Sequence, residues 1–109
     1  MSRLVEHLYS KGVSRDSIEK LLSGGIVYDE TDAFTILVEA KRLGAKVLFE
    51  DEVGGLDSEP YYAVILEYGG YILLYLACIH RHSIRLYSSR DYWRALGIAR
   101  EFLNRASRS

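Results

Sequence analysis

Nineteen consecutive residues, 60–78, carry a single charged side chain, that of Glu67. Two adjacent glycines, Gly69 and Gly70, divide this segment into two apolar runs. A strand with one solvated face shows alternating apolar and polar residues, whereas both faces of these runs are apolar. The segment is therefore predicted to form a β-hairpin that turns at the two glycines and lies at the centre of the fold.

Pairing the two runs across the glycine turn assigns each residue to one face of the hairpin. One face is expected to carry Tyr62, Val64, Leu66, Tyr68, Tyr71, Leu73, Tyr75 and Ala77. The other is expected to carry Tyr61, Ala63, Ile65, Glu67, Ile72, Leu74, Leu76 and Cys78. Helices in a chain of 109 residues can cover one face and part of the second. The apolar area left over on the second face predicts a homodimer or a protein partner.

Helices and further strands are predicted on both sides of the hairpin. Apolar spacing and glycine stops predict a helical hairpin within 1–25, a helix over 32–43 and a last helix from Ser88 or Ser89 to about Ala106. Strands are expected at 45–50, before an acidic loop over 51–59, and at 83–87, after a tight turn. The chain is thus expected to be one α+β domain, with a core over 32–106 built on a mixed or antiparallel sheet of about four strands flanked by helices.

The composition of the chain indicates where in the cell, and in what kind of organism, the protein is expected to function. No apolar run reaches membrane-spanning length and no signal segment opens the chain, so we expect a cytoplasmic protein with no membrane association. The lone cysteine excludes an internal disulfide and fits a reducing compartment. Glutamine is absent and asparagine occurs once, at Asn104, a scarcity of thermolabile amides that predicts a thermophilic source.

Charge is distributed unevenly along the chain. Residues 1–78 hold seven Lys and Arg against thirteen Asp and Glu, whereas 79–109 hold seven Arg against two acids. A basic end fits an anionic partner such as nucleic acid, or attraction between neighbouring molecules or segments. The nucleic-acid-binding candidates are His80, Arg81, His82, Arg85, Arg90 and Arg94. On the last helix, however, an arginine stripe also fits a plain solvated face.

The central segments resemble a known family. RLGAKVLFEDEV, the acidic loop and PYYAVILEYGGYILLYLACIHR together are similar to the core of the PD-(D/E)xK nucleases, and most of all to archaeal Holliday junction resolvases and their relatives. The similarity covers roughly 32–106 and lies in hydrophobicity and turns. It implies a restriction-endonuclease-like core, in which two strand carboxylates hold Mg²⁺ and a lysine helps to activate or orient the attacking water.

The family's catalytic positions are changed in this chain. Its proline matches Pro60, but the aspartate position holds Tyr61, and the acid and the lysine of the family's triplet fall on Leu76 and Cys78. The helix glutamate of the resolvases falls near Ala33. The resemblance therefore implies a catalytically inactive nuclease-fold protein, a binding or structural subunit in nucleic-acid metabolism that holds no metal or cofactor.

Other interpretations stay open. Asp57 and Glu59, just before the hairpin, are weak candidates for a migrated metal site that would retain nuclease activity. A self-associating interaction module with no nucleic-acid role fits the second apolar face equally well.

His80 and His82 are spaced to share one strand face and bind a transition metal, although as turn residues they are expected to be solvated. Cys78 is expected to be a small buried hydrophobe. The order helix, three strands, helix also resembles a double-stranded-RNA-binding domain, whose lysine-rich opening of the last helix is missing from SSRDYWRAL.

Overall fold

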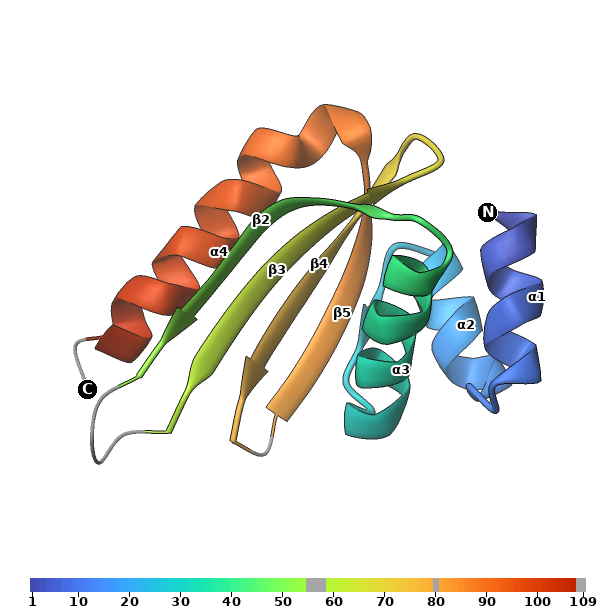
Figure 1. Ribbon diagram of the computed structural model, residues 1–109, viewed down its shortest axis with the longest axis horizontal. Coiled ribbons are helices and arrows are strands. Elements are labelled where there is room, and N and C mark those ends of the chain that lie inside the picture. Colours follow the sequence, from blue (N-terminus) through green and yellow to red (C-terminus); the bar gives the residue numbers. More distant parts are fainter. Residues whose placement is uncertain (55–58, 80, 108–109) are drawn as a thin grey trace.

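An antiparallel sheet of five strands forms the centre of the molecule, with helices on both of its faces (Figure 1). The computed structural model describes residues 1–54, 59–79 and 81–107. Along the chain the elements are α1 (Ser2–Ser10), α2 (Arg15–Leu22), β1 (Ile26–Val27), α3 (Glu30–Arg42), β2 (Lys46–Val53), β3 (Tyr61–Tyr68), β4 (Tyr71–Cys78), β5 (Arg81–Ser88), the 3₁₀ turn η1 (Ser89–Asp91) and α4 (Tyr92–Ser107). The strand order is β1-β5-β4-β3-β2. Within the described ranges no helix is both long and apolar enough to cross a bilayer.

The predicted α+β class is confirmed, and the strand count is corrected from about four to five. The additional strand, β1, is only two residues long and pairs with β5. A run this short shows no periodicity, so sequence patterning could not identify it. All strand pairs are antiparallel.

The β3–β4 hairpin has the predicted register. Tyr62 lies opposite Ala77 and Tyr68 lies opposite Tyr71, so each residue is on the face assigned to it from the sequence. Gly69 and Gly70 have φ values of 55° and 83°. Both values lie in the left-handed region that a tight two-residue hairpin turn requires and that glycine adopts without strain.

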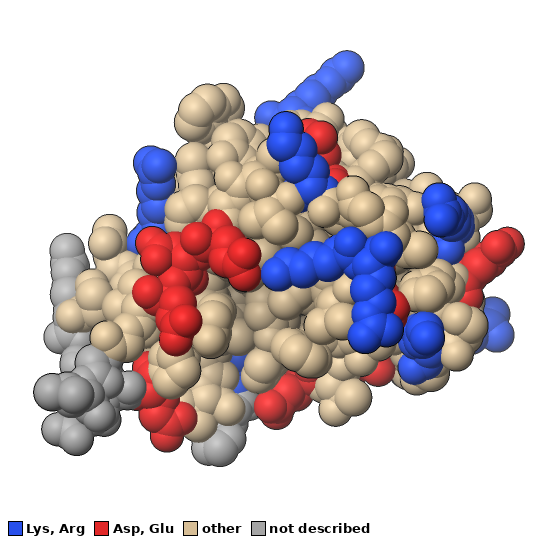
Figure 2. All heavy atoms as spheres, in the orientation of Figure 1, with Lys and Arg blue, Asp and Glu red and all other residues tan. Residues whose placement is uncertain are grey.

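Two strands are longer than predicted. β2 extends through 51–53, which were expected to form a loop, because these residues pair with 61–63 of β3. β2 is an edge strand, and charged residues are common on such edges because they oppose pairing with another chain. Figure 2 shows acidic side chains gathered over β2. β5 begins at Arg81 instead of residue 83, since Arg81 and His82 continue the ladder with Cys78 and Ala77.

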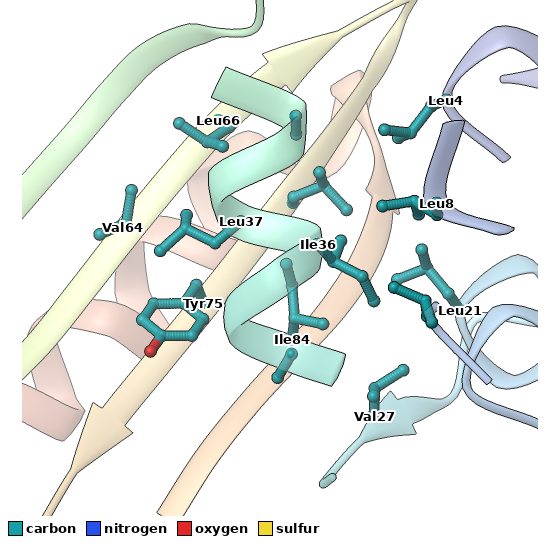
Figure 3. Packing of buried hydrophobic residues seen from close by; sticks show 14 of the residues in the cluster. Leu4, Leu8, Leu21, Val27, Ile36, Leu37, Val64, Leu66, Tyr75 and Ile84 are labelled. Atoms are coloured by element: carbon teal, nitrogen blue, oxygen red, sulfur yellow. The ribbon is translucent and has the colours of Figure 1, made fainter. Parts of the chain in front are cut away.

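The sheet face that carries α3 has the larger hydrophobic cluster. Ile36 and Leu37 of α3 pack over the strands, where they meet Val64, Leu66 and other residues of β3, β4 and β5 (Figure 3). The helix begins two residues before the predicted start, because the Asp29 side chain accepts a 2.8 Å hydrogen bond from the Asp32 amide and caps it. α1 packs on α3, and α2 packs on β1 and β5. The predicted helical hairpin thus closes one side of this layer.

Two buried carboxylates fasten that hairpin to α3. The Asp32 carboxylate accepts hydrogen bonds from the Ser17 hydroxyl at 2.6 Å and from the Ser14 hydroxyl at 2.8 Å. Burial raises the pKa of Asp32, but the hydrogen bonds from Ser17 and Ser14 outweigh it and hold the pKa below its usual value. Glu39 accepts a 2.7 Å hydrogen bond from His7, which lowers the pKa of Glu39 against the opposing effect of burial.

The second sheet face is covered by α4. Ala63, Ile65 and Ile72 of the sheet are buried against Ala99 and Leu103 of the helix. The buried side of α4 is formed by Ala95, Leu96, Ala99 and Leu103. The apolar face from which a homodimer was predicted is therefore covered by this chain's own helix α4. The homodimer stays a prediction.

Candidate functional site

A cleft of about 720 Å³ lies between the C-terminal part of α4 and the sheet, at the end where β3 begins and β4 ends. We name it the α4 cleft. The strands contribute Tyr61, Leu76, Cys78, Arg81, His82 and Ser83 to its lining, α4 contributes Phe102, Arg105 and Ala106, and Tyr28 follows β1. Its volume is about twice that of a cavity beside α3, which is about 360 Å³.

Strand alternation explains why these side chains meet. Tyr61, Leu76 and Cys78 are on the face that α4 covers, and β5 continues this face because Ser83 pairs with Leu76 and Arg81 pairs with Cys78. Side chains from β3, β4 and β5 thus lie next to one another and form one wall of the α4 cleft. Tyr28 directly follows β1, which pairs with β5, and its side chain is 70% exposed at the rim.

The helix supplies the opposite wall. Phe102 and Arg105 are three residues apart and so lie on one side of α4. The Phe102 ring is 5.5 Å from the Tyr61 ring, measured between centroids, and this contact joins the two walls at their base. The contact leaves the outer part of the cleft bounded by aromatic rings and guanidinium groups.

Positive charge dominates the α4 cleft. Arg81 and Arg105 line it, and its lining contains no carboxylate. Arg105 donates a 2.7 Å hydrogen bond to Glu101, but both side chains are largely exposed, and such pairs contribute only about 0–1 kcal/mol. Arg105 can therefore exchange Glu101 for an anionic ligand at little cost. Arg81 is exposed and makes no ion pair with any described residue.

The nuclease-like positions are brought together only in part. Tyr61, Leu76 and Cys78 all line the α4 cleft, whereas Ala33 is fully buried under α3 on the opposite sheet face. Cys78 is half-buried at the cleft wall, which corrects its expected place in the core. The strand ends at this residue, so the apolar run there is partly accessible to solvent.

Arg81 and Arg85 are two of the predicted nucleic-acid contacts. They differ in whether the guanidinium group already has a partner within the protein. Arg81 lies in the α4 cleft. Arg85 is on the same face of β5, but its Nε donates a 3.0 Å hydrogen bond to the Gly24 carbonyl, and its guanidinium lies 4.9 Å from the centroid of the Tyr87 ring. Arg85 thus ties the helical hairpin to the sheet.

The other candidates do not lie together. Arg90 and Arg94 follow β5 at the opposite end of the sheet, where the Ser89 amide donates to the Gly70 carbonyl. His82 is a strand residue whose side chain contacts Tyr75 on the α3 face, not a solvated turn residue. His80 lies outside the described residues. The predicted set therefore does not form one surface.

The migrated metal site stays untested. Glu59 is exposed just before β3, and Asp57 lies outside the described residues. Among the described residues, no three His, Cys, Asp or Glu side chains are grouped so as to hold a metal ion.

Sequence reasoning missed two parts of the cleft. Tyr28 gave no signal because β1 is too short to show a pattern. Phe102 and Arg105 could not be placed at a common site, because local spacing does not tell where a helix crosses a sheet. Comparison of the chain with protein-family models, with curated proteins and with solved structures gave no match in any of the three.

Proposed function

We propose that this protein binds single-stranded nucleic acid in the α4 cleft and does not cleave it. The observation that carries this proposal is the composition of the cleft, in which aromatic rings and arginines converge without a carboxylate. Bases of a single strand stack on aromatic side chains, and arginines contact the phosphates between them. Tyr28 is the most exposed of these rings and is the expected stacking platform.

The shape of the cleft favours an unpaired strand over a duplex. Its volume of about 720 Å³ falls within the range typical of small-ligand sites, roughly 300–1,000 Å³. An extruded base with its sugar and phosphate fits such a concave site. A duplex presents a convex surface, and proteins usually read it with a helix or a β-ribbon that projects into a groove.

Binding without cleavage is supported by the residues at the base of the cleft. Tyr61, Leu76 and Cys78 stand where the resemblance to nucleases places two carboxylates and a lysine. A phenol, an isobutyl group and a thiol do not provide the hard oxygen ligands that Mg²⁺ prefers. Descent from an active nuclease is part of this proposal, but the binding role does not depend on it.

Fluorescence anisotropy with a short labelled oligonucleotide of mixed sequence tests the proposal. We expect binding that weakens with salt, with a slope of log K against log salt near −1.4, since each phosphate contact to a single strand contributes about −0.7 and two arginines line the cleft. The same sequence as a duplex is expected to bind at least tenfold more weakly at equal salt, an estimate of roughly 1.4 kcal/mol for the lost stacking of one base.

Matched variants locate the site. Arg81→Ala is expected to weaken binding and to make the salt slope shallower by about 0.7. Arg90→Ala removes the same charge from the other end of the sheet and is expected to change neither quantity. Equal losses in the two variants would show that binding is a general charge effect and would reject the α4 cleft. Metal-dependent cutting of the oligonucleotide, abolished by changing Asp57 or Glu59, would reject the absence of cleavage.

A further inference from the structure

A second cavity, of about 360 Å³, lies on the opposite sheet face, beside α3. We name it the α3 pocket. Its inner wall is apolar and is formed by Leu37 of α3 and by Val64 and Ala77 of the strands. Figure 3 shows Leu37, Val64 and Tyr75 in this region, between the helix and β3 and β4. Phe34, which is 51% exposed, and Tyr62, which is 37% exposed, stand at its mouth.

Polar groups line one end of the α3 pocket. Burial raises the pKa of Tyr75 to about 12, so its hydroxyl keeps its proton at neutral pH, and this hydroxyl is hydrogen-bonded to Nδ1 of His82. Nε2 of the same ring lies 3.3 Å from the Glu30 carboxylate. The bond to His82 gives the buried phenol a partner, and Glu30 is exposed at the start of α3.

The side of the pocket nearest β2 is acidic. Glu50 and Glu52 pair with Val64 and Tyr62 and therefore lie on the α3 face. A hydrogen bond with Glu52 raises the pKa of Tyr62, which places this carboxylate beside the ring at the mouth. Lys41 is 3.4 Å from Glu50, and it is the one lysine or arginine in the lining.

The charges around the pocket do not balance. The lining itself holds one carboxylate, that of Glu50, and one ammonium group, that of Lys41, which lie 3.4 Å apart. Two more carboxylates lie at its edges, that of Glu52 beside Tyr62 and that of Glu30 at 3.3 Å from Nε2 of His82. An anion is therefore repelled from the mouth. The apolar inner wall offers no oxygen ligands for a bare metal ion, whereas the aromatic rings at the mouth offer their negative faces to an organic cation.

We propose that the α3 pocket binds a small organic amine, with its apolar body against Leu37, Val64 and Ala77 and its ammonium group between the aromatic rings and the carboxylates of β2. The cavity volume is near the lower end of the range for ligand sites, which suits an amine with one ring or a short chain. The inference does not depend on nucleic-acid binding: His82 borders both cavities, but Phe34, Tyr62 and Glu50 line the α3 pocket and not the α4 cleft.

Isothermal titration of the full chain with 2-phenylethylamine, backed by amide NMR, tests the charge of the ligand. We expect saturable binding, with shift changes at Phe34, Tyr62 and His82. The neutral analogue 2-phenylethanol is expected to bind at least fivefold more weakly, and the anion 3-phenylpropionate is expected not to bind. Equal affinities for the amine and the alcohol would overturn the proposal, and so would the absence of saturable binding of the amine at millimolar concentration.

A pair of neighbouring residues provides the matched control. Glu50→Gln and Phe34→Ala are each expected to weaken amine binding by about threefold to tenfold, the range expected for one exposed ion pair or one cation–π contact. Asp51→Asn removes the same charge from the adjacent residue, whose partner Ala63 is on the α4 face, and is expected to leave the affinity unchanged. An equal loss in the Asp51→Asn variant would assign the effect to net charge and reject the pocket. All three sites are solvent-exposed, so the variants are expected to fold, which circular dichroism checks.

Discussion

The two faces of the sheet are covered in different ways. On the α3 face, a hydrophobic cluster is reinforced by directional contacts between elements, such as those of Asp32 with Ser14 and Ser17 and that of Glu39 with His7. On the α4 face, a smaller cluster joins the helix to the sheet through apolar side chains and the Tyr61–Phe102 ring pair. Specific hydrogen bonds thus hold α1 and α2 on α3, whereas α4 is held on the sheet by apolar packing.

The difference extends to the cavities. Both lie at the same end of the sheet, but the α4 cleft presents arginines and the α3 pocket presents carboxylates. One sheet can thus present opposite charges to its two sides, because successive strand residues point to opposite faces. Four predictions test how far the two faces are independent.

Core truncations should give the largest effect and should differ between the faces. Ile36→Ala, at a fully buried site in the α3 cluster, is expected to lower the free energy of unfolding by about 4 kcal/mol. Leu103→Ala is expected to lower it by about 2–3 kcal/mol, since this residue is near the end of α4 and solvent or neighbouring side chains can fill part of the void. Urea denaturation followed by circular dichroism measures both. Equal losses would contradict the distinction between the two layers.

Removing a polar anchor should have the next largest effect. Asp32→Ala leaves the buried Ser17 hydroxyl without its acceptor and is expected to lower stability by about 2 kcal/mol. Asp16→Ala, an exposed change in the same helical hairpin, is the control and should cost about 0.5 kcal/mol or less. If the two variants unfold at the same urea concentration, the hydrogen bonds of Asp32 do not stabilise the α3 layer.

Acid should weaken the α3 layer before the α4 layer. The pKa values of Asp32 and Glu39 are lower in the folded chain than in the unfolded chain. The unfolded chain therefore binds protons first as the pH falls, so the stabilisation is complete above about pH 4–5 and is lost at lower pH. Amide hydrogen exchange as a function of pH should show earlier loss of protection in α1 and α2 than in α4. In the Asp32→Asn, Glu39→Gln double variant this pH dependence should be largely abolished.

The smallest effect is expected at the buried phenol. Tyr75→Phe removes the hydroxyl that is hydrogen-bonded to His82 and is expected to lower stability by about 1 kcal/mol at neutral pH. The wild-type chain should also lose stability as the pH rises from about 10 to about 12, because the unfolded chain ionises this tyrosine first while the folded chain keeps its proton. Ultraviolet titration of the phenolate in both proteins measures the difference. A variant with the same alkaline transition as the wild type would show that Tyr75 is not shielded.

The sequence predicted the hairpin better than it predicted its surroundings, for physical reasons. The Gly69-Gly70 turn and the period of two fix the register, so every face assignment in β3 and β4 is confirmed. The end of β2 was missed because edge strands tolerate charge, as at Asp51 and Glu52. β1 was missed because pairing with β5, rather than any local pattern, makes it a strand.

The sites were less accessible to sequence reasoning. Strand alternation alone brings Tyr61, Leu76 and Cys78 together, and this part of the α4 cleft followed from the hairpin. The wall made by α4 depends on the path of the helix across the sheet, which is set by packing over several strands. The α3 pocket combines residues from α3 and four strands, such as Phe34, Glu50 and His82, whose proximity appears only in the folded chain.

The alternation of β5 has a consequence for how this protein can change over evolution. Arg81 lines only the α4 cleft, whereas His82, its neighbour, borders both cavities and is hydrogen-bonded to Tyr75 on the α3 face. A deletion of one codon before β5 that slipped this strand by one residue against β4 would exchange the two side chains. The arginine would then stand beside Tyr75 and Glu30, and the imidazole would enter the α4 cleft. Such a mutant would change the charge of the ligand that each cavity prefers, in both cavities at once. Point substitutions are therefore the more accessible way to change the ligand preference of one cavity alone.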